Sequence, residues 1–212
     1  VLANGGLPLR TDIASLTLNV GSGGAHVFDI SGVTVNASTL AANASVTLSA
    51  NNGITMAGNL AATGTGTLEI DADEDNNGSG ILTINNGVAV STANQTIFMD
   101  AADFVVNGTG SINSGSGEIT LMPSSNVTMG IGTGAGIFSV DNTDLAAIST
   151  TGTLVLGSDV RDSAVTADAV AAGAKNLSIK TNSTINDSDD TGDSITTSGT
   201  LTLRSNGIIG SL

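Results

Sequence analysis

Two short acidic clusters contain the residues of this sequence that are best suited to bind a metal ion. In both, carboxylates recur at alternate positions, and Gly192 in the second cluster permits a sharp turn. Calcium takes six to eight oxygen ligands and favours flexible, carboxylate-rich loops. Neither cluster ends in a glutamate at the twelfth position, so solvated acidic loops are the alternative interpretation. The candidate calcium ligands are Asp71, Asp73, Asp75, Asp187, Asp189 and Asp193.

Residues suited to catalysis are sparse. Enzymes that cleave sugars need paired carboxylates at a defined separation, usually with aromatic or arginine side chains that hold the sugar. This chain has no Trp and no Tyr, its only arginines are Arg10, Arg161 and Arg204, and its sole histidine is His26. No serine and aspartate pattern near His26 indicates a catalytic triad. We therefore expect no enzymatic activity and no required cofactor.

A recurring pattern of aliphatic residues indicates the elements that must position these loops. Each copy has two aliphatic residues at alternate positions, then a small residue, then a β-branched aliphatic residue four positions later. The fullest copies are Val46, Leu48, Ala50 and Ile54; Ile97, Met99, Ala101 and Val105; Leu177, Ile179, Thr181 and Ile185; and Leu201, Leu203, Ser205 and Ile209. Partial copies begin at Leu68, Ile119 and Leu154, and Leu16, Leu18 and Val20 form a weaker one.

The spacing of these copies predicts a coiled fold. Most first positions are 22 to 24 residues apart, and the longer steps indicate insertions. Alternation within each copy places successive side chains inside and outside a strand, and the small residue suits a corner. We predict an all-β fold, a right-handed parallel β-helix (β-solenoid) with about 22 residues per coil and eight to nine coils.

This prediction fixes the expected organisation. Residues 1–212 form a single β-solenoid segment of a longer repeat protein, with acidic loops inserted near 71–80 and 187–193. A β-sandwich would instead place hairpin turns between dissimilar strands. An α/β fold would need amphipathic helices, and only the alanine-rich stretch from Ser163 to Lys175 could supply one; it fits a short helix or a strand and corner equally well.

The pattern also predicts which side chains fill the core. One aliphatic side chain per coil points inward, in a row formed by Leu48, Ile70, Met99, Leu121, Leu156, Ile179 and Leu203. The residue before each of these points outward. Lysine at Leu121 would bury an unpaired charge and cost several kcal/mol, whereas lysine at Thr120 should cost little.

Charge excludes several classes of partner. The formal net charge is −14, which repels nucleic acid and anionic lipid. No apolar run of about 18 residues exists, so we expect no direct membrane insertion. Residues 30–68 and 76–99 carry no charged side chain. We call these residues the charge-free flank; it could pack against a neighbouring molecule at little desolvation cost.

Three phrases resemble the repeats of filamentous-haemagglutinin-like exoproteins of bacteria: LAAISTTGTLVLGSDV (145–160), NLSIKTNSTINDS (176–188) and GTLTLRSNGIIG (199–210). The repeat style covers most of the chain and is shared with autotransporter passenger domains. The resemblance implies a secreted, extracellular adhesin, stalk or fibre at the cell surface. Its partners would be the same protein, adjoining repeats, or surface glycans and proteins.

We therefore expect a structural or adhesive module of an extracellular fibre, stalk or filament. A stacked rod has open ends, and these ends favour pairing with another copy or continuation into further repeats. The alternative is a carbohydrate-active or carbohydrate-binding parallel β-helix protein.

Overall fold

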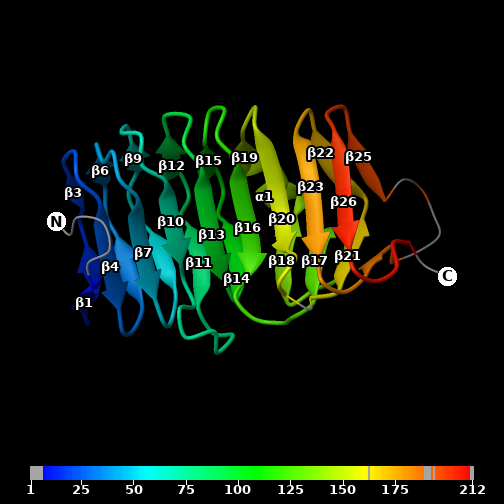
Figure 1. The fold of residues 1–212 in the computed structure, drawn as a ribbon, viewed down its shortest axis with the longest axis horizontal. Helices are drawn as coiled ribbons and strands as arrows, with labels where there is room; N and C mark the ends of the chain where they lie inside the picture. Colours follow the sequence, from blue (N-terminus) through cyan, green and yellow to red (C-terminus); the bar gives the residue numbers. More distant parts are fainter. Residues whose placement is uncertain (1–6, 162, 189–191, 193, 211–212) are drawn as a thin grey trace.

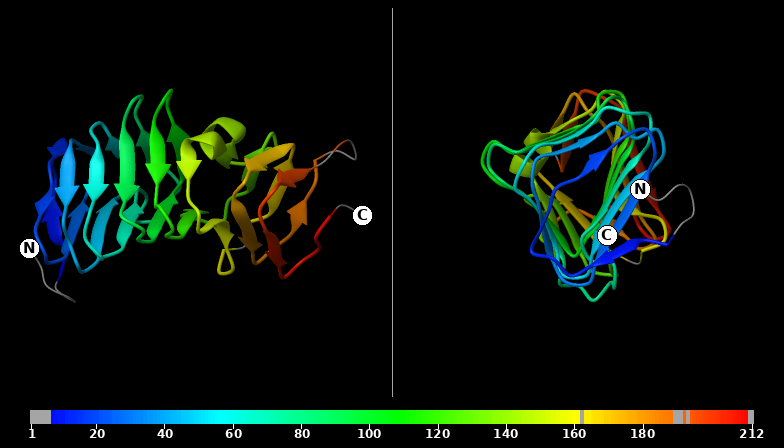
Figure 2. Two further views of the ribbon diagram at one scale, coloured as in Figure 1. Left: turned by 90° about the horizontal axis from the view of Figure 1, so that it is seen from above. Right: turned by 90° about the vertical axis from the view of Figure 1, so that its left-hand side faces the viewer.

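The chain winds into an elongated rod of stacked β-coils (Figure 1). The computed structural model describes residues 7–161, 163–188, 192 and 194–210. Seen along the rod, the coils enclose a roughly triangular cross-section with a sheet on each side (Figure 2). Every pairing between the described strands that belong to these sheets is parallel. The prediction of an all-β parallel β-helix is confirmed.

One side of the rod is a single nine-stranded sheet, which takes one strand from each coil. Its strands, in spatial order, are β1 (Leu9–Thr11), β4 (Ala25–Asp29), β7 (Val46–Ala50), β10 (Leu68–Asp71), β13 (Ile97–Ala101), β16 (Ile119–Pro123), β20 (Thr153–Ser158), β23 (Asn176–Thr181) and β26 (Leu201–Ser205). We call it the long sheet.

The second side is formed by two shorter sheets in sequence along the rod. The first contains β2 (Ser15–Leu16), β5 (Val33–Val35), β8 (Ile54–Met56), β11 (Ile81–Ile84) and β14 (Asp103–Val106). The other contains β18 (Phe138–Asp141), β17 (Met129–Gly132), β21 (Val165–Asp168) and β24 (Ile185–Asn186).

The third side is likewise divided. One sheet contains β3 (Asn19–Val20), β6 (Ser38–Leu40), β9 (Leu60–Ala62), β12 (Ala89–Thr92), β15 (Ser111–Asn113) and β19 (Ile148–Ser149), and a pair is formed by β22 (Val170–Gly173) and β25 (Ile195–Thr197). The helix α1 (Asn142–Ala147) directly precedes β19 and packs against β22.

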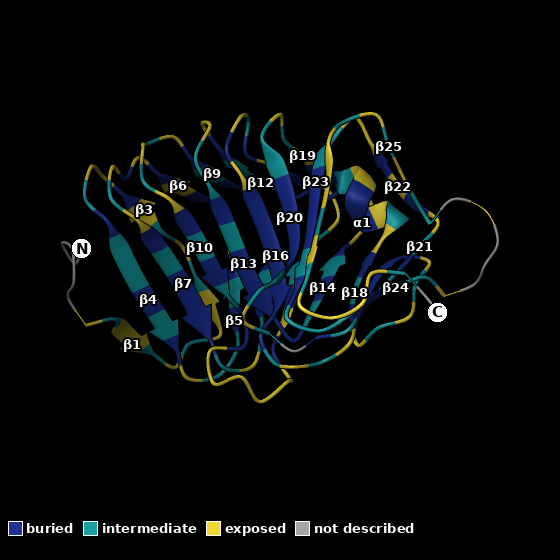
Figure 3. Ribbon diagram, turned by 45° about the vertical axis from the view of Figure 1, so that its right-hand side comes forward, coloured by how far each residue is buried: buried dark blue, intermediate teal, exposed yellow. Residues whose placement is uncertain are grey.

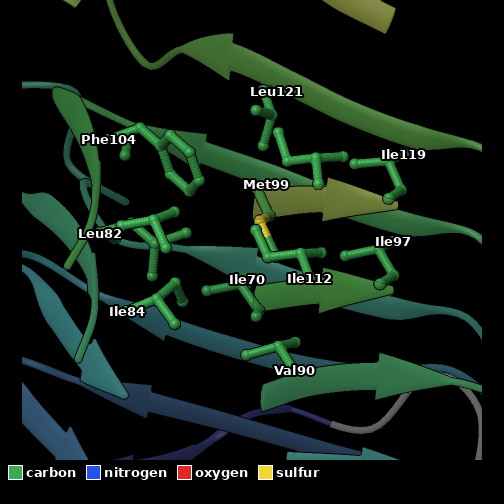
Figure 4. Packing of buried hydrophobic residues seen from close by; sticks show 14 of the residues in the cluster. Ile70, Leu82, Ile84, Val90, Ile97, Met99, Phe104, Ile112, Ile119 and Leu121 are labelled. Atoms are coloured by element: carbon green, nitrogen blue, oxygen red, sulfur yellow. The ribbon is translucent and has the colours of Figure 1, made fainter. Parts of the chain in front are cut away.

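The predicted inward row is present in register. Leu48 pairs with Ile70, and the row continues through Met99 and Leu121 to Leu203 without a slip. All its members are buried except Leu203, which is partly buried in the last coil. The strands are correspondingly dark along the rod in Figure 3. Figure 4 shows Met99 and Leu121 of the long sheet facing Leu82 and Phe104 of the second side.

Two assignments within the repeat are wrong. Leu16 and Val20 belong to the second and third sides, and the first-coil and second-coil members of the inward row are Leu9 and Val27. The repeat pattern requires two buried aliphatic residues, and strand β4 was missed because it carries only one. Val105 points away from the core, because Phe104 and Val106 are the buried residues of β14.

The outward face of the long sheet is more covered than its alternation suggests. Thr120 is only 9% exposed and Val155 only 3%. Both line a shallow hollow with Phe98, Met122 and Lys180, whose side chains lie on the same outer face. Thr120 points outward as expected, but its low exposure indicates that lysine there costs more than its outward direction alone predicts.

Asparagine side chains tie the corners of successive coils together. Asn86 Oδ1 accepts the Thr109 N–H at 2.9 Å, and Asn94 Oδ1 accepts the Ser116 N–H at 3.0 Å. Asn176 Oδ1 accepts the Thr200 N–H at 3.0 Å in the same way. Each bond pairs a turn N–H that no strand ladder can reach. The high asparagine content thus has a structural cause.

The regular winding is interrupted at β17 and β18. The chain passes from β16 to β17, reverses through residues 133–137, and returns as β18, which pairs in parallel with β17 and lies against β14. The reversing segment crosses directly over Gly130: a Cβ at this position would lie 2.2 Å from the Gly134 oxygen and 2.7 Å from the Gly136 nitrogen. Only glycine fits there.

The helix α1 follows this reversal. Asp141 caps its N-terminus, and the buried Leu145 enters the core. Asn142 accepts the Ala171 N–H and donates to the Ala169 oxygen, which fixes α1 beside β22. The alanine-rich stretch 163–175, for which a short helix and a strand with a corner were equal alternatives, forms the strands β21 and β22.

Lysine substitutions should reveal the inward row. We expect Leu121→Lys to lower the free energy of unfolding by at least about 4 kcal/mol, because it buries an unpaired charge. Thr120→Lys should cost less but measurably, and the exposed Thr39→Lys should change stability by less than about 0.5 kcal/mol. Urea denaturation followed by circular dichroism measures all three; equal effects at Leu121 and Thr39 would contradict the assigned register.

Alanine at Gly130 tests the reversal. Gly130→Ala should lower the free energy of unfolding by at least about 2 kcal/mol, since the crossing backbone cannot move aside cheaply. Gly21→Ala is the matched control, because a Cβ there would meet nothing within 4 Å. A Gly130→Ala variant as stable as the Gly21→Ala variant would exclude the close crossing.

Candidate functional site

A group of buried polar side chains lies at the corner between the long sheet and the second side. Asp71 and Asp100 are register neighbours on β10 and β13. Between β10 and β11 the chain makes an excursion of residues 72–80, which Figure 1 shows projecting below β11. We call residues 73–80 the acidic loop. Its base, Asp73, is fully buried.

Asp73 closes the acidic loop. Its Oδ2 accepts the Gly78 N–H at 2.9 Å and the Ser124 hydroxyl at 2.5 Å. The loop returns at Gly80, which lies against the Ala72 and Asp73 backbone so closely that a Cβ would clash. The loop of the fourth coil is thus attached to the corner of the sixth.

Arg161 brings a positive charge to this corner from the segment after β20. Its Nη2 lies 3.4 Å from Asp100 Oδ2 and 3.1 Å from Asn76 Oδ1. No sequence pattern indicates this contact, because 61 residues separate Arg161 from Asp100 and Arg161 lies outside the repeat pattern.

Burial dominates the electrostatics of the corner. Burial, followed by the negative charge of Asp100, raises the pKa of Asp71 to about 8. Burial also raises the pKa of Asp100 to about 6, although the Arg161 guanidinium opposes this change. One guanidinium therefore leaves the corner with excess negative charge when all of its carboxylates are ionised.

The structure brings together part of the first predicted calcium site. Asp71 and Asp73 lie near each other, and the pKa of Asp71 is sensitive to Asp100, which the sequence pattern did not include. Asp75 is exposed, and its carboxylate accepts the Asn77 N–H and side-chain amide. Within the described ranges, no three acidic, histidine or cysteine side chains are grouped closely enough to hold a metal ion by themselves.

The second predicted site is described only in part. Asp187 Oδ2 accepts the Ser194 hydroxyl at 2.6 Å, near the end of the rod. Asp189 and Asp193 lie outside the described residues.

Three of the residues considered for catalysis, His26, Arg10 and Arg204, lie on strands of the long sheet. His26 lies on the long sheet as the register partner of Thr47. Arg10 stacks on the Phe28 ring at 4.8 Å from its centroid, and Arg204 pairs with Asp159 at 2.8 Å.

A shallow hollow on the second side is polar but uncharged. Thr34, Thr55 and Thr83 stand in register on its floor, with Asn52 and Ser79 at its edge. Part of the charge-free flank predicted from the sequence lies here. The alignment of the three threonines was not foreseen, because the second strand of each coil was not placed in register from the sequence.

Comparisons with known proteins add no assignment: no family model, no curated protein and no solved structure matches this chain. No helix in the described part of the chain has the length and hydropathy needed to cross a membrane.

The raised pKa values predict how stability depends on pH. Both folded pKa values lie above the ordinary 3.8, so the stability that these groups contribute is complete below about pH 4 and is lost as pH rises through about 6 and 8. In buffer treated with a chelator, the free energy of unfolding should fall between pH 5 and pH 9.

Asp71→Asn should remove part of this fall. Asparagine keeps an oxygen for the Asp73 N–H, so the variant should match the parent near pH 4 and exceed it at pH 9. Denaturant titrations across this range measure the difference, with the exposed Asp75→Asn as control. A pH-independent difference for Asp71→Asn would refute the assignment.

Proposed function

We propose that this chain is a structural or adhesive module of an extracellular bacterial fibre, stalk or surface filament. The observation that carries the proposal is the uninterrupted nine-stranded ladder of the long sheet, whose end strands β1 and β26 each have one edge that no described strand pairs with. The repeat style resembles that of filamentous-haemagglutinin-like exoproteins, and this resemblance is the support for an extracellular location.

The ends of the rod support stacking on further coils. At one end Leu9 is 61% exposed, although it occupies the inward row. At the other end an apolar hollow is lined by Ile185, Ile195, Leu203 and Ile209. A further coil, from an adjoining repeat or a second copy, would bury both apolar surfaces and pair both edges.

The uncharged hollow on the second side supports the adhesive part of the proposal. Its threonine hydroxyls and the Asn52 amide offer hydrogen bonds without the cost of removing charges from water. Surface glycans and proteins present complementary groups. The same hollow is the feature that favours the alternative, a carbohydrate-binding β-helix protein.

Cross-linking tests the stacking of coils. The chain has no cysteine, so Arg10→Cys on β1 and Arg204→Cys on β26 introduce unique thiols. If copies stack end to end with the rows aligned, these thiols lie on adjacent strands, about 5 Å apart. A mixture of the two variants at high concentration should form a heterodimer with a short thiol cross-linker.

Thr39→Cys, on the third side, is the control and should not cross-link with either variant. Electron microscopy of the uncross-linked protein should show rods of doubled length. Monomeric rods at every concentration, with no cross-linked product, would contradict assembly between copies.

A further inference from the structure

Two carboxylates at the acidic loop each leave one buried oxygen without a hydrogen-bond partner. Asp73 is fully buried, and its Oδ1 has no partner although Oδ2 has two. Asp100 is 6% exposed, and its Oδ1 is also unpartnered. Ser49 Oγ, on the strand that pairs with β10, is a third such atom. Buried polar atoms without protein partners indicate an ordered water or an ion.

The charges at this corner favour a cation over water alone. Asp71 and Asp100 are register partners on β10 and β13, and the Asp73 N–H donates to Asp71 Oδ1 at 3.1 Å, so three carboxylates lie at the base of the loop. Their one basic neighbour in the described structure is Arg161, which reaches Asp100 only through a long 3.4 Å contact. Ionised carboxylates at such burial need a paired positive charge.

We propose that a divalent cation, Ca²⁺ by its ligand chemistry, binds between Asp73 and Asp100 at the base of the acidic loop. Two carboxylates, neutral protein oxygens and water supply its oxygen ligands. The site differs from the alternating pattern in the sequence. Asp75 hydrogen-bonds Asn77 and is not a ligand of this site. Asp100, which belongs to the next coil, is a ligand.

Calcium titration of the whole chain tests the site. Isothermal titration calorimetry should give one binding event that depends on Asp73 and Asp100, and 10 mM Ca²⁺ should raise the thermal unfolding midpoint by several degrees. Asp73→Asn and Asp100→Asn should each weaken binding at least tenfold. Asp75→Asn should change it less than twofold, as the matched control in the same loop.

A localisation experiment keeps the proposal testable if a variant fails to fold. Mn²⁺ added to the unsubstituted protein should broaden the amide NMR signals of Gly78 and Ala101 before those of Ser194. Absence of binding to the unsubstituted protein would overturn the proposal. So would binding that survives Asp100→Asn and disappears with Asp187→Asn, because the cation would then occupy the other acidic cluster.

Discussion

Each coil depends on the backbone hydrogen bonds that it shares with the coils on either side. A coil of about 22 residues buries too few aliphatic side chains to offset the entropy of ordering its own backbone. Parallel pairing between coils supplies the remaining stabilisation. It also aligns similar residues, so that Leu48, Ile70 and Met99 stack in one row. The corner asparagines likewise form hydrogen bonds between successive coils, at turns where no strand pairing is present.

The sequence was most informative where this stacking repeats without interruption. From Val46 onward the inward row could be predicted from the sequence, because each coil has an aliphatic residue at the same position of the repeat. The buried Ala50, Ala72 and Ala101 confirm the small corner residue. The first coils were misread because β4 presents His26 and Phe28 outward and has only Val27 as a buried aliphatic residue. A pattern that requires two aliphatic residues misses such a strand.

The site was less predictable, because it joins parts of the chain that the repeat does not relate. Asp71 and Asp73 could be selected from their spacing, but the contributions of Asp100 and Arg161 follow from register and from a loop two coils away. The alternation in sequence also gives no sign that the Asp75 carboxylate accepts hydrogen bonds from Asn77 in a local turn. The composition and the repeat period of the sequence predict the rows of stacked core residues. A site at a corner depends on which loops fold over that corner, and the repeat does not specify this.

The reversal between β17 and β18 has a consequence for how the rod is made. A solenoid can in principle grow vectorially, each coil settling on the last as it leaves the ribosome. Here β18 lies between β14 and β17, so the earlier-synthesised β17 has no finished surface to settle on until β18 follows it. Residues 129–141 must therefore dock as one unit, although β16 before them can pair with β13 on its own. The rod therefore has two segments, which meet at this boundary and are joined by the continuous long sheet.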